Sequence, residues 1–124
     1  MRTLSTDAAA TALGVDRKIV DNVFAREARH LVRAGSRGRR RRISVEVLEL
    51  VAIALILNRD LGIGIAKGIK LAKAMREAPS AEVSAGSLTT LAFDLPGLRR
   101  ALELSIAEAL ESVAEPPRGR PAAG

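Results

Sequence analysis

Eight arginines are concentrated in a short stretch of the first third of this 124-residue chain. Within residues 26–42, only Glu27 opposes them. A cluster of a single charge sign repels itself unless a polyanion faces it, and the planar guanidinium group can bind two phosphate oxygens at once. A basic loop without fixed structure would have the same composition. We interpret the stretch as a nucleic-acid contact formed by Arg26, Arg29, Arg33, Arg37, Arg39, Arg40, Arg41 and Arg42.

The residue types that most enzymes use for catalysis are scarce in this chain. It contains no cysteine, and its single histidine, His30, lies in the basic stretch without an obvious carboxylate to orient it. Glu108, Glu111 and Glu115 have the spacing of a solvated helix face rather than of a metal site. We therefore expect no enzymatic activity, no catalytic residue, no metal site and no cofactor.

Two short helices are predicted just before the basic stretch. Thr6–Leu13 is rich in alanine and is followed by Gly14, a residue typical of a helix C-terminus. Arg17–Ala28 has apolar residues at spacings of three and four, which predicts an amphipathic helix that begins after Asp16. Two helices joined by a Gly-Val turn predict a helix-turn-helix unit, in which the second helix enters a major groove. The polar face of this helix is expected to consist of Arg17, Lys18, Asp21, Asn22 and Arg26.

A basic hairpin and two more helices are predicted to follow. Arg29–Arg33 and Arg39–Ile43 flank a loop with two glycines, which predicts a β-hairpin anchored by Leu31 and Ile43. Such a hairpin next to a helix-turn-helix is a wing that grips the DNA backbone or minor groove. Ser44 is a typical N-cap residue for the helix after it. The two helices are expected at Val45–Asn58, apolar almost all round, and at Ile63–Glu77.

The C-terminal third is predicted to contain a linker, a strand and a helix. Proline, serine and glycine interrupt the periodicity at residues 78–86, Ser87–Phe93 alternates like a strand, and Asp94 is expected to cap a helix that extends to about Val113. A lone strand leaves backbone groups unpaired, so we expect it to pair with the same strand of a second copy across a twofold axis. The expected dimer seam consists of Leu91, Phe93, Leu98, Leu102 and Ile106.

The order helix, helix, basic wing, helix, helix resembles the MerR-like winged helix-turn-helix superfamily, which includes phage excisionases and small actinobacterial regulators. The resemblance covers about residues 4–76 and lies in Thr6-Asp7-Ala8-Ala9-Ala10…Leu13-Gly14-Val15-Asp16-Arg17, Arg40-Arg41-Arg42-Ile43-Ser44 and Asp60-Leu61-Gly62-Ile63. It implies that Arg17, Lys18, Asn22 and Arg26 face the groove and that residues 39–42 belong to the wing.

The chain departs from this superfamily in two ways. It lacks the cysteines that metal-sensing members use, so that activity does not carry over. A linker, a strand and a compact helix stand in place of the long dimer coiled coil that usually follows the fourth helix. Small DNA-binding antitoxins can share such a layout, with a DNA-binding front and a partner-binding back.

The tail has a second resemblance. Pro117-Arg118-Gly119-Arg120-Pro121 is similar to the core of an AT-hook, in which the glycine lets an extended backbone enter a narrow minor groove. Arg118 and Arg120 would then lie along the groove floor on either side of Gly119. A chance match in an arginine-, proline- and glycine-rich tail is the alternative, and we expect residues 115–124 to be disordered.

These patterns predict a mainly α fold, a winged helix-turn-helix with a basic β-hairpin wing, plus a C-terminal strand and dimerisation helix. The expected domains are a DNA-binding domain at residues 1–77, a linker at 78–86, a strand-helix segment for dimerisation or partner binding at 87–114, and the tail at 115–124.

The function expected from these patterns is sequence-specific binding of double-stranded DNA by a homodimeric repressor. One alternative is an antitoxin whose C-terminal segment neutralises a toxin, and another is an excisionase-like architectural factor that bends DNA. The longest apolar run, Leu50–Leu57, is too short to span a membrane, so we expect no membrane partner and a cytoplasmic, nucleoid-associated protein.

Overall fold

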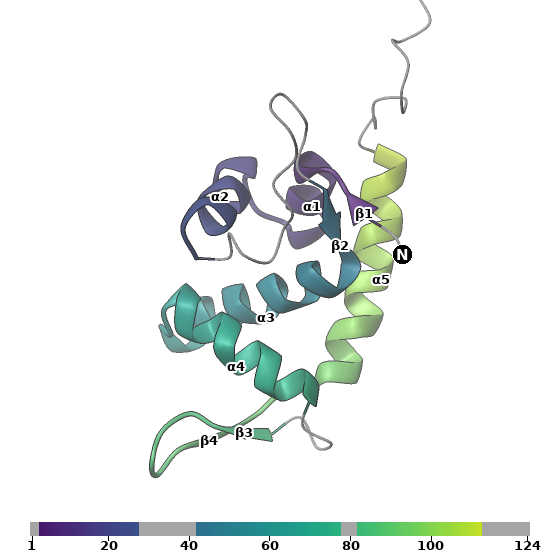
Figure 1. Ribbon diagram of the computed structural model, residues 1–124. Helices are drawn as coiled ribbons and strands as arrows, with labels where there is room; N and C mark the ends of the chain where they lie inside the picture. The colour runs from purple at the N-terminus through teal and green to yellow at the C-terminus, as the bar shows by residue number, and fades with distance from the viewer. Residues whose placement is uncertain (1–2, 28–41, 78–81, 113–124) are drawn as a thin grey trace, which may run out of the picture.

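The computed structural model describes residues 3–27, 42–77 and 82–112, and most of these residues are helical (Figure 1). Short antiparallel strand pairs supplement the helices. The mainly α class is therefore confirmed. In chain order the elements are β1 (Thr3–Leu4), α1 (Thr6–Leu13), α2 (Arg17–Asn22), the π-helical turn η1 (Val23–Glu27), β2 (Ile43–Ser44), α3 (Val45–Leu61), α4 (Ile65–Glu77), β3 (Glu82–Ser84), β4 (Thr90–Ala92) and α5 (Leu95–Ser112).

The turn between α1 and α2 is fixed by local capping. The Ser5 hydroxyl accepts a hydrogen bond from the Ala8 amide at 3.1 Å, which begins α1. Gly14 ends α1 in the left-handed conformation, with φ +69°, where a residue with a side chain would be strained. Asp16 precedes α2 as predicted but makes no side-chain capping bond. The two helices are held together by buried Val20 and Phe24 of the α2 segment, which belong to the same hydrophobic cluster as the alanines of α1.

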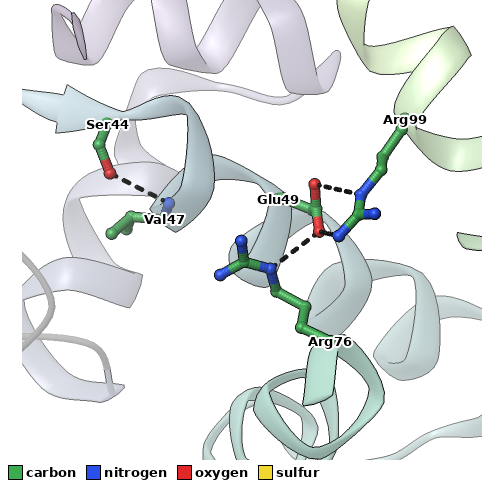
Figure 2. Close-up of polar contacts among 5 residues, drawn as sticks. All are labelled: Ser44, Val47, Glu49, Arg76 and Arg99. Carbon is green, nitrogen blue, oxygen red and sulfur yellow. Dashed lines mark hydrogen bonds and ion pairs between the residues drawn. The ribbon is translucent and has the colours of Figure 1, made fainter. Parts of the chain in front are cut away.

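The central helix α3 separates two hydrophobic clusters, which explains why it is apolar almost all round. Its Leu48 and Val51 belong to a cluster shared with α1, α2 and α5, whereas Ile53 and Leu57 belong to one shared with α4 and β3. The helix begins as predicted, because the Ser44 hydroxyl accepts a hydrogen bond from the Val47 amide at 3.2 Å (Figure 2).

The C-terminal helix α5 packs along α1, although the two are far apart in sequence (Figure 1). Asp94 caps it by accepting a hydrogen bond from the Gly97 amide at 2.9 Å. Leu102, Ile106 and Ala109 lie in the cluster that also contains the alanines of α1. Helices α1, α2 and α5 therefore share one core.

One buried carboxylate joins α3, α4 and α5. Glu49 of α3 is only 6% exposed and lies 3.0 Å from the Arg76 Nε atom of α4 (Figure 2). The Arg99 guanidinium of α5 donates two hydrogen bonds to it, at 2.9 and 3.0 Å. These hydrogen bonds raise the pKa of Arg99 above its ordinary value. The pairing fixes the three helices against one another and satisfies the buried charge.

Two sequence predictions for the C-terminal third are wrong. Residues 82–84, expected in a linker, form β3, which pairs antiparallel with β4 in the register Val83 to Leu91. The strand expected at Ser87–Phe93 is shorter than predicted, and it has its partner in the same chain. The strand therefore needs no second copy to pair its backbone.

The expected dimer seam is also largely internal. Leu102 and Ile106 are buried in the core of their own chain. Leu91, Phe93 and Leu98 are partly buried and pack against the cluster of α3, α4 and β3. Folding of the single chain therefore covers Leu102 and Ile106, whereas Leu91, Phe93 and Leu98 keep part of their surface exposed.

Candidate nucleic-acid interface

The α2 segment exposes a polar face and buries the opposite one. Val20, Val23 and Phe24 are at most 5% exposed. Lys18 and Asn22 lie on the exposed side, as does Arg26 in η1. The sequence prediction of an amphipathic second helix is therefore confirmed, although after Asn22 the helix continues as a π-helical turn rather than as regular α-helix.

Arg17 is placed differently from the other predicted contacts. Its guanidinium lies 3.1 Å from the Asp7 carboxylate of α1 and 3.6 Å from that of Asp21. All three side chains are about half exposed, so each contact contributes at most about 1 kcal/mol. Two carboxylates therefore compensate the charge of Arg17. Its contact with Asp7 connects α2 with α1, while its side chain stays exposed at the surface.

Asn22 and Arg26 face a pocket that the sequence analysis did not predict. It has a volume of about 740 Å³ and lies between the α1–α2 turn, α3 and α5. Arg59 also lines it, and its guanidinium donates to the Asp60 carboxylate at 2.8 Å. That hydrogen bond lowers the pKa of Asp60. One signal of the pocket was present in the sequence, since Ile19 is an apolar residue on the polar side of its helix, and it is 40% exposed.

Of the arginines predicted for the wing, Arg42 alone lies within the described residues. Its Nε atom donates to the Thr3 hydroxyl at 3.2 Å, and its NH2 group donates to the Thr3 carbonyl at 3.1 Å. β1 and β2 pair at the same place, in the register Thr3 to Ser44 and Leu4 to Ile43. Arg42 therefore fastens the end of the basic stretch to the first strand, a role that the sequence analysis missed.

Ile43 is fully buried, which confirms it as an anchor. Its described strand partner is Leu4 of β1. The rest of the predicted hairpin, including Leu31, lies outside the described residues. The same holds for the remaining predicted contacts of the wing and the tail, which are Arg37, Arg39, Arg40, Arg41, Arg118, Gly119 and Arg120.

Within residues 3–27, 42–77 and 82–112, no three histidine, aspartate or glutamate side chains gather as a metal site would require. No helix in these ranges combines the length and hydropathy needed to cross a membrane.

In comparisons with known proteins, no family model, no curated protein and no solved structure matches the chain.

Proposed function

We propose that the chain is a sequence-specific, double-stranded DNA-binding regulator that places α2 in the major groove. The observation that carries this proposal is the two-sided α2 segment, which buries Val20 and Phe24 and exposes Lys18 and Asn22. A helix held by one side and polar on the other is what major-groove reading requires, because that groove is wide enough for one helix.

The surrounding charge supports the same proposal. Six arginines lie between the end of η1 and Arg42, so the chain leaves the α2 segment, passes through the basic stretch and returns at β2. Arg42, which follows this stretch in the sequence, is bound to Thr3 of β1. In the proposal, the arginines of this stretch contact phosphates and set the register, whereas α2 contacts base edges.

Within α2, Asn22 and Arg26 are the proposed base-reading residues. Asparagine can bind adenine through two hydrogen bonds, and arginine can bind guanine in the same way, each pair contributing about 1–3 kcal/mol of discrimination. Lys18 is proposed to contact phosphate, because a flexible ammonium group carries less geometric information than a guanidinium or amide.

The experiment that tests this proposal selects bound duplexes from a random DNA library and then measures affinity for the selected and a scrambled sequence. We expect Asn22→Ala to reduce affinity for the selected duplex by about 5- to 150-fold and to change binding to the scrambled duplex little. Arg100→Ala removes an exposed arginine of α5 and serves as the matched control. Equal losses on both duplexes would contradict base reading by Asn22, and a failure to enrich any sequence would favour the architectural alternative.

The homodimer is part of the proposal, although pairing of the C-terminal strand with a second copy no longer supports it. A single short recognition helix reads only one half-site, and two copies related by a twofold axis read two half-sites about 34 Å apart. Light scattering of the full chain on the selected duplex measures the stoichiometry. One copy on a non-repeated site would contradict the dimer.

A further inference from the structure

The pocket beside α2 has the size and composition of a small-molecule site. Its volume of about 740 Å³ is within the range of about 300–1,000 Å³ typical of ligand pockets. Most of its lining residues are apolar and come from the α1–α2 turn, from α3 and from α5. All of them belong to the part of the chain that the structure describes.

Small side chains at the crossing of these elements create the hollow. Ala52 of α3 and Ala101 and Ser105 of α5 line it. Larger residues form the walls, among them Ile19, which is 40% exposed. An apolar ligand would cover this wall, and removing its apolar surface from water favours binding.

The charged side chains that line the pocket are basic. Arg26 and Arg59 line the pocket and no acidic side chain does. Arg59 is compensated by two hydrogen bonds to Asp60, whereas Arg26 has no hydrogen bond or ion pair with any described residue. An uncompensated guanidinium next to an apolar hollow complements a ligand with an apolar body and one anionic end.

We propose that this pocket binds a small amphipathic carboxylate, with the apolar body between α3 and α5 and the carboxylate at Arg26. The inference deepens the proposed function, and the effect of the ligand on DNA binding rests on that function. Asn22 and Arg26 are the proposed base-reading residues and they also line the pocket. A bound carboxylate therefore competes with DNA for Arg26, and each ligand weakens the other by the same factor.

Binding is tested without DNA, by calorimetric titration of the full chain with decanoate and with decanol. We expect decanoate to bind about tenfold more tightly than decanol, because only the carboxylate forms a charge-assisted contact with Arg26. Arg26→Gln should remove this preference and leave decanol binding unchanged. Equal affinities for the two probes in the original protein, or no binding of either, would overturn the inference.

Two variants of α5 test the position of the ligand. Ala101→Leu adds bulk at an exposed lining position and should weaken both probes at least tenfold, whereas Ala107→Leu, exposed on the same helix outside the pocket, should weaken neither. Equal effects of the two variants would overturn the assignment of the ligand to this pocket. If decanoate does not bind and Ala101→Leu turns a dimer into a monomer by light scattering, the groove is an interface between copies instead.

A last measurement separates this inference from the proposed function. Decanoate should weaken binding of the selected duplex by the original protein and leave binding by Ala101→Leu unchanged. Binding of decanoate without binding of any duplex would refute the proposed function and keep the pocket. Binding of duplex without binding of decanoate would refute the pocket and keep the proposed function.

Discussion

Glu49 shows how one residue can determine the relative positions of several helices. It is buried, and its partners Arg76 and Arg99 come from the two helices that pack against α3 and its neighbours. We expect Glu49→Ala to lower the free energy of unfolding by about 1–3 kcal/mol, because both guanidinium groups lose their partner but remain accessible to water. Urea denaturation measures the change. Glu108→Ala, exposed on α5, should change it by less than about 0.5 kcal/mol, and equal effects would contradict this role of Glu49.

At the scale of elements, the crossing of α3 and α4 depends on Gly68. A Cβ atom there would lie 3.1 Å from both Cα and Cβ of Ala54, so the helices approach too closely for a larger residue. Gly68→Val should lower the free energy of unfolding by about 1–3 kcal/mol through overpacking. Ala74→Val introduces valine at an exposed position of α4. It should lower the free energy of unfolding only by the difference in helix propensity between alanine and valine, about 0.6 kcal/mol. Thermal unfolding of the two variants compares them directly, and a similar loss in both would contradict close packing at Gly68.

The elements that could be predicted from the sequence are those fixed by neighbouring residues. Ser5, Ser44 and Asp94 each cap the helix that begins beside them, and Gly14 ends the first helix where expected. Each of these interactions spans only a few residues, so the sequence contains the whole signal.

The features that the sequence did not predict depend on residues far apart. The strand β3 has three residues and exists because it pairs with β4. Arg42 bonds to Thr3 across 39 positions. The pocket beside α2 forms only when α3 and α5 are in place. No local pattern in the sequence predicts these contacts. The ion pairs of α3 did have a signal, because Glu49 lies beside an apolar run and a buried carboxylate needs a partner.

At the scale of the whole molecule, the net charge of +6 is unevenly distributed, and the salt dependence of DNA binding should reflect this. Each phosphate contact contributes about 0.9 to the slope of log K against log salt concentration. We expect replacement of Arg39, Arg40 and Arg41 by alanine to reduce that slope by about 2.7, three times this amount. The control Arg100→Ala should leave it unchanged, and an unchanged slope in the triple variant would refute phosphate binding by these residues. Arg42→Ala is expected to act mainly on stability, because its guanidinium is bound to Thr3.

The packing of α5 on α1 has a consequence for the protein while it is being made. On the ribosome, Thr6–Leu13 is synthesised before Leu102 and Ile106, which share its core and follow more than 80 residues later. At about 5–20 residues per second, the ribosome needs roughly 4–16 s to proceed from the end of α1 to the start of α5. During this interval the alanine face of α1 lacks its cover. The α1–α2 unit therefore acquires its final packing only after α5 has been synthesised, and a stop codon upstream of α5 would leave the alanine face of α1 uncovered.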